Sequence, residues 1–83
     1  MTEDTNEVVA KPAHIQLREI ARRGGCVIVK AEEYTAVQLK DVAMFGKAAN
    51  SKLIIRHASE LAFTDCQVIA SANPGNVYFD FTK

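Results

Sequence analysis

The sequence predicts a small α/β protein in which three helix–strand repeats form a three-stranded parallel sheet with the helices packed on one face. One helical template occurs three times: an apolar residue, an Ile or Val and then an Ala three and four positions later, and a Gly or Asn at the seventh. A short β-rich run follows each copy, and parallel strands joined by a helix make right-handed crossovers. The three copies are Leu17, Ile20, Ala21, Gly24; Leu39, Val42, Ala43, Gly46; and Cys66, Ile69, Ala70, Asn73.

Length and composition are those of one ordinary domain. The chain has 83 residues, 48% of them hydrophobic and 24% charged. Ten basic residues balance ten acidic ones, so any binding to nucleic acid or an anionic membrane would need a local patch of charge. No apolar run approaches the roughly 18 residues of a membrane span, and residues 1–10 hold acids but no base, unlike a secretory signal. We therefore expect a cytoplasmic protein with no membrane partner.

The first unit comprises a tail, a helix and a strand. Residues 1–11 show no apolar period, and we expect a disordered acidic tail there, with the folded domain at residues 12–83. Pro12 suits the first turn of a helix that should end at Arg23, because Gly24-Gly25 allows a left-handed turn. The residues of this helix that we expect to be buried are Leu17, Ile20 and Ala21. Those that we expect to face solvent are Arg18, Glu19 and Arg22.

The second unit carries the clearest helix-start signal. A strand at 26–31 precedes Thr35 and Gln38, which have the spacing of a capping box, and the helix should end at Gly46. The segment 47–52 is longer than its counterparts, and insertions in a repeat map to loops. The candidate binding residues in this loop are Lys47, Asn50 and Lys52.

The third unit repeats the plan with a shift. The strand of the second unit should span 53–57, and a second Thr-x-x-Gln box predicts a short third helix beginning at Thr64. The run 73–76 is a strong stop and turn, followed by a last strand at 77–81. An ungapped match of 26–43 with 53–70 would place Val29 opposite Arg56 and exchange the two faces of the strand, so we predict a one-residue gap at the strand end.

The charges assign the strand faces. Lys30, Arg56 and Asp80 would be buried in one register, and an unpaired buried charge costs several kcal/mol. The other register turns two rows of side chains away from the helices, and these are the candidate partner-binding residues. The apolar row is Ile28, Ile54 and Tyr78, and the charged row is Lys30, Arg56 and Asp80. Residues expected against the helices are Val27, Val29, Ala31, Leu53, Ile55, Val77, Phe79 and Phe81.

The open strand face favours an interaction protein. Leucine-rich-repeat solenoids leave such a face bare and bind through it, although their Leu-x-x-Leu-x-Leu-x-x-Asn spacing is absent here. We expect a short, solenoid-like, non-catalytic module that forms a homodimer or binds another protein through this face, an exposed sheet edge or the 46–52 loop. A three-layer alternative, with one helix on the opposite face, would bury the apolar row within the monomer.

Nucleic-acid binding is the second hypothesis. Helix ends and the loops after them share one side of a repeat array, so basic side chains there could form one edge, with Tyr78 stacking a base. The zero net charge and Asp80 beside Tyr78 weaken it. The basic residues are Arg18, Arg22, Arg23, Lys47 and Lys52.

An enzyme is the third class, and we expect none. His57 ends a strand, where α/β sites occur, but no second His or Cys is spaced for zinc and no phosphate-binding glycine loop follows a strand. Cys26 and Cys66 occupy slots that apolar residues fill in the other repeats, and we expect reduced core or near-core thiols. We therefore predict no cofactor and no metal.

Overall fold

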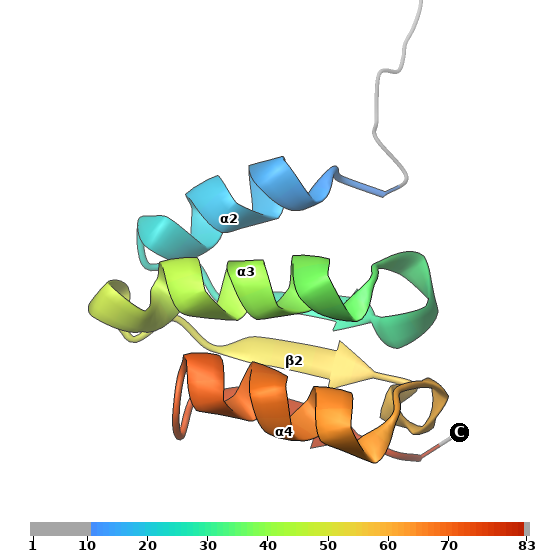
Figure 1. Cartoon of the computed structure of the whole chain (residues 1–83). Coiled ribbons are helices and arrows are strands. Elements are labelled where there is room, and N and C mark those ends of the chain that lie inside the picture. The colour runs from blue at the N-terminus through green and yellow to red at the C-terminus, as the bar shows by residue number, and fades with distance from the viewer. Residues whose placement is uncertain (1–10, 83) are drawn as a thin grey trace, which may run out of the picture.

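A computed structural model describes residues 11–82 as alternating helices and strands (Figure 1). The acidic tail expected at residues 1–11 lies, except for Lys11, outside the described residues. The helices are α2 (His14–Arg22), α3 (Ala36–Gly46) and α4 (Phe63–Ala72), and the strands are β1 (Val27–Lys30), β2 (Leu53–Arg56) and β3 (Val77–Asp80). Short 3-10 turns follow β1, α3 and β2; they are η1 (Ala31–Glu33), η2 (Lys47–Ala49) and η3 (Ala58–Glu60).

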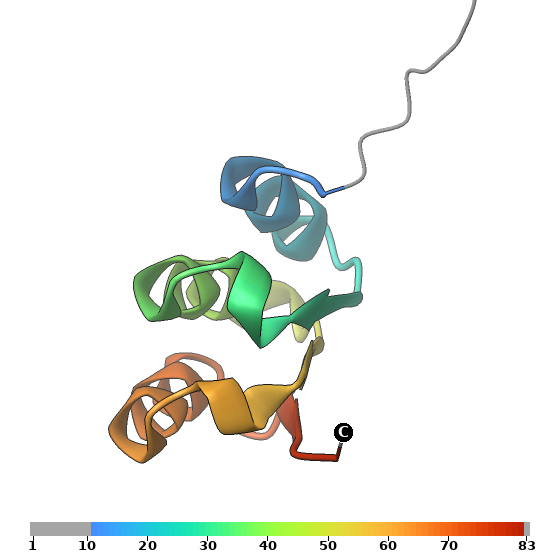
Figure 2. The same ribbon diagram turned by 90° about the vertical axis from the view of Figure 1, so that its right-hand side faces the viewer.

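The predicted architecture is confirmed. The strands pair in parallel in the order β1-β2-β3. Within residues 11–82, the three helices lie on one face of the sheet and the other face is open, so the three-layer alternative is wrong (Figure 2). Because each helix precedes its own strand, the helix layer is displaced toward the β1 side of the sheet, and α2 overhangs β1 (Figure 2).

The core lies between the sheet and the helices, in the predicted strand register. Its largest fully buried side chains include Leu53 and Ile55 of β2 and Leu39, Val42 and Ile69 of the helices. Phe81 corrects the prediction: it lies beyond the end of β3, is exposed, and stacks on Phe79 with 6.2 Å between ring centroids.

His57 is the predicted one-residue gap. Val27 pairs with Leu53 and Lys30 with Arg56, so the strands match at an offset of 26 residues. His57 then adopts the left-handed conformation, with φ at 58°. Because of this extra residue, Ala58 is buried at the position that Ala31 occupies in the previous repeat, although the two alanines are 27 residues apart and the paired strand residues are 26 apart.

Three predictions in the first repeat are wrong. Ile20 is 45% exposed, because the strand that would precede β1 and cover it is not among residues 11–82. Arg18 is half-buried and stacks on the Phe45 ring, its guanidinium carbon 4.3 Å from the ring centroid. Cys26 is exposed, since it precedes β1 on the open-face side.

The two capping predictions have opposite outcomes. Thr35 caps α3 as expected: its Oγ1 accepts from Gln38 N at 3.1 Å, and Gln38 Oε1 accepts from Thr35 N at 2.9 Å. The Thr64 box is wrong, because α4 begins at Phe63 with Ala62 as an N-cap that makes no side-chain bond. Packing fixes this start: burial of Ile69 sets the phase of α4, and Ala62 falls at the place of Thr35.

A buried polar network joins the three repeats where the strands begin; we call it the strand-start edge. Ser51 Oγ donates to the carbonyl of Ala21 at 2.5 Å, and Asn73 Nδ2 donates to the carbonyl of Ser51 at 3.0 Å. Gly46 fits between them, because a Cβ there would lie 2.9 Å from Ser51 Cβ. Asn76 Nδ2 completes the network by donating to Asn73 Oδ1 at 3.0 Å.

Candidate interaction surface

An apolar row crosses the open face of the sheet. Ile28 pairs in register with Ile54, and Ile54 with Tyr78, so their side chains lie side by side on neighbouring strands. Ile28 is 64% exposed and Tyr78 47% exposed, while Ile54 between them is half-buried. This row lies where the sequence placed it.

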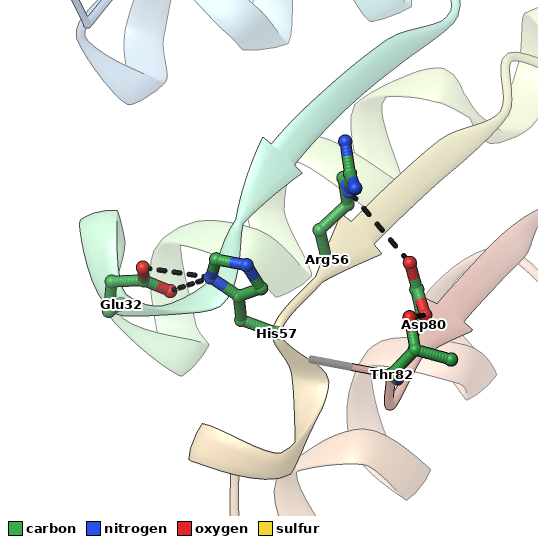
Figure 3. Close-up of polar contacts among 5 residues, drawn as sticks. All are labelled: Glu32, Arg56, His57, Asp80 and Thr82. Carbon is green, nitrogen blue, oxygen red and sulfur yellow. Dashed lines mark hydrogen bonds and ion pairs between the residues drawn. The ribbon is translucent and has the colours of Figure 1, made fainter.

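A charged row runs beside the apolar one. Lys30, Arg56 and Asp80 are in register and none is buried, as the choice of strand face required. Arg56 Nε lies 3.8 Å from Asp80 Oδ2 (Figure 3). Hydrogen bonds from the Thr82 hydroxyl and backbone N–H hold the pKa of Asp80 below its usual value, with a smaller contribution from Arg56. Asp80 is therefore the fixed negative end of a row that is otherwise positive.

The strands end at a second polar cluster, the strand-end edge, made by Glu32, Arg56, His57, Asp80 and Thr82 (Figure 3). His57 reaches from the turn after β2 to Glu32 in η1, with Nδ1 2.9 Å from Oε2. Hydrogen bonding to His57 is the main reason that the pKa of Glu32 is lowered. An open hollow of about 250 Å³ lies beside it, lined by His57, Ser59, Glu60 and Thr82.

Sequence reasoning singled out His57 but missed Glu32 and Thr82. The available signal was the one-residue gap, which turns the His57 side chain sideways toward the preceding repeat. The spacing from Glu32 to His57 repeats nowhere else in the chain and gave no motif.

The loop candidates lie at the opposite end of the strands. Lys47 begins η2, and Asn50 after it takes the left-handed conformation with φ at 56°. Lys52 directly precedes β2 and alternates in phase with Ile54 and Arg56, so it extends the open face. Lys47, Asn50 and Lys52 are all exposed, but only Lys52 belongs to the sheet surface.

The basic residues that could bind nucleic acid lie on one side of the molecule (Figure 1), but two of them contact other side chains of the protein. The ends of α2 and α3 and the turns after them do lie on one side of the molecule (Figure 1). Arg22 is paired with Glu19 at 2.6 Å, and Arg18 is stacked on Phe45. Arg23, Lys47 and Lys52 are exposed. Nucleic-acid binding stays a prediction.

The two cysteines differ. Cys66 is buried as expected, and its burial, followed by the charge of Asp65, raises the pKa of its thiol, which disfavours the thiolate. Cys26 is exposed, and its Sγ accepts from Lys52 N at 3.4 Å. Within residues 11–82, no three His, Cys, Asp or Glu side chains are grouped so that they could hold a metal ion. Across the same residues, no helix has the length and apolar character needed to cross a membrane.

In comparisons with known proteins, the chain matches no protein-family model, no curated protein and no solved structure.

Proposed function

We propose that this protein is a non-catalytic interaction module whose open sheet face binds a second copy of the chain. One observation carries the proposal: the apolar row of Ile28, Ile54 and Tyr78 lies uncovered in the centre of a parallel sheet. Parallel sheets are normally covered on both faces, and in the part of the chain that the structure describes only one face is covered (Figure 2). A second copy supplies the missing cover without any further component.

The charged row selects how two copies fit. With the two-fold axis parallel to the strands, β1 of one copy lies over β3 of the other, and each row covers itself. Ile28 then meets Tyr78 of the second copy, and Lys30 meets Asp80. Arg56 lies over Arg56 of the second copy, and each has Asp80 of its own chain 3.8 Å away. In the second arrangement the two-fold axis is perpendicular to the strands and the apolar row of one copy covers that of the other. Arg56 would then face Lys52 of the second copy. Of these two arrangements, only the first pairs opposite charges.

The size of the face sets the strength of the dimer. Three strands spaced about 4.8 Å apart present far less than the roughly 800 Å² per partner of a standard stable interface. The dimer should therefore be weak, with a dissociation constant in or above the micromolar range. Association must be measured across a range of concentrations.

Sedimentation equilibrium of the full chain tests the proposal. We expect the mean mass to rise with concentration, and Ile54→Lys to lower this rise relative to wild type, because it places a charge at the centre of the face-to-face contact. Met44→Lys is the matched control, since Met44 is 48% exposed on α3, in the helix layer. A wild-type chain that stays monomeric up to about 1 mM, or equal loss with Met44→Lys, would contradict the proposal.

A further inference from the structure

The two ends of the repeat array are complementary. In the helix layer, α2 overhangs β1 at the first end, while at the last end β3 projects with no helix beyond α4 (Figure 2). Among residues 11–82, each end therefore lacks the layer that the other end offers (Figure 2). This relation is independent of the open face used in the proposed function.

Ile20 marks what the first end lacks. Its equivalents in the repeat are Val42 and Ile69, which are 1% and 0% exposed, while Ile20 is 45% exposed. A strand that preceded β1 in the sheet would cover Ile20, because the strand of the preceding repeat lies beside each later helix, β1 beside α3 and β2 beside α4 (Figure 2). The exposure of Ile20 thus marks a strand position that no element of residues 11–82 occupies.

Phe63 marks the last end. Between α3 and α4, Ala36 and Val37 of one helix face Val68 and Ile69 of the other across a shared hollow. Phe63 is the repeat equivalent of Ala36 and is 76% exposed, because no helix follows α4 within residues 11–82. A helix in that position would present the equivalents of Val68 and Ile69. In α2 these are Glu19 and Ile20.

The strands and charges continue in the same register. Val27 N donates to the carbonyl of Lys52, and Leu53 N donates to the carbonyl of Asn76. The next bond of this series runs from Val77 N to the carbonyl of Cys26 in another copy. That register sets Asp80 beside Lys30, so the charged row gains an opposite-charge contact at the junction.

We propose that copies of this chain associate head to tail, with β3 of one copy pairing in parallel with β1 of the next and α2 covering the end of the first copy. The contact is heterologous, so it forms an open array rather than a closed dimer. Ile20 and Phe63 meet at the junction, and each is exposed in the single chain.

Complementation of two variants tests this arrangement. Both carry Ile54→Lys, so the open face contributes nothing and the outcome does not depend on the proposed function. Ile20→Asp blocks the first end and Phe63→Asp blocks the last end, each by placing a charge in the junction. Since both residues are exposed, folding is retained, and circular dichroism verifies this.

Sedimentation equilibrium up to about 1 mM gives the answer. The Ile54→Lys parent should show a mean mass that rises with concentration without a plateau at two chains. Each aspartate variant alone should stay at one chain, and an equimolar mixture should reach two chains and stop, because one intact junction remains. Met44→Asp in the same parent should associate as the parent does. A monomeric parent, variants that associate as the parent does, or a mixture that stays monomeric would overturn the proposal.

Discussion

The two ends of the same parallel strands are built differently. At the strand-start edge, Ser51 and Asn73 are buried and join all three repeats through hydrogen bonds. At the strand-end edge, a hydrogen bond joins Glu32 to His57 and an ion pair joins Arg56 to Asp80, and both contacts are partly exposed and lie between neighbouring repeats.

This difference separates an edge on which the stability of the fold depends from an edge that can vary. A buried polar group left without a partner costs about 1–3 kcal/mol, whereas an exposed ion pair contributes about 0–1 kcal/mol at most. The strand-start edge should therefore tolerate little change, and the strand-end edge can vary with small effects on folding. The open face and its charged row border the tolerant edge, where binding residues can be placed without loss of the fold.

The strongest test of the comparison is Asn73→Ala. Asn73 is 1% exposed, and its removal leaves the Ser51 carbonyl without its donor and Asn76 Nδ2 without its acceptor. We expect the free energy of unfolding in urea to fall by about 1–3 kcal/mol for each buried group left unpaired. Ser71→Ala, at an exposed position of α4, should change it by less than about 0.5 kcal/mol. Equal effects of the two would remove the distinction.

Gly46→Ala should have the next largest effect. Gly46 has helical dihedral angles, so alanine would gain about 0.5–1 kcal/mol in helix propensity. Its Cβ would lie 2.9 Å from Ser51 Cβ and 3.3 Å from Ala21 Cβ, and overpacking costs about 1–3 kcal/mol. We expect a net loss of about 1 kcal/mol by thermal unfolding. A Gly46→Ala variant more stable than wild type would show that the residues of the strand-start edge can move apart to make room for the added methyl group.

Helix capping offers a second comparison, between the equivalent starts of α3 and α4. Thr35→Ala removes the hydrogen bond to Gln38 N and should lower the free energy of unfolding by about 0.5–2 kcal/mol. The equivalent residue of α4 is Ala62, which has no side-chain bond, so Ala62→Ser should raise it by a comparable amount. Urea unfolding of both variants checks the pair. Opposite signs are expected, and a shared sign would contradict the equivalence of the two helix starts.

The smallest effect concerns acid stability. Because the hydrogen bond with His57 lowers the folded pKa of Glu32 from its ordinary 4.5, the pair stabilises the fold above that pH. This contribution is lost as the pH falls through the lowered value. Glu32→Gln should therefore flatten the dependence of the unfolding free energy on pH below 4.5. An NMR titration giving Glu32 an ordinary pKa would refute the pair.

Much of the fold followed from local patterns. The recurrence of Leu39, Val42, Ala43 and Gly46 in two other places predicted the helices, and period-two alternation with charges predicted the strand faces. The positions of the apolar and charged rows therefore follow from the sequence. Ile20, Cys26 and Arg18 were misplaced, because a residue in a terminal repeat has the same local pattern as one in a central repeat but fewer neighbours.

The sequence by itself determined the repeat, its parallel order and which side chains turn to solvent, because these depend on periodicity and on the cost of burying charge. Only the tertiary structure decided which equivalent positions are covered and which distant groups meet, such as Glu32 with His57 and Asn73 with Ser51. The physical reason is that coverage depends on the neighbouring element in space. Ile20 keeps the template of a core residue and lacks only the strand that would bury it.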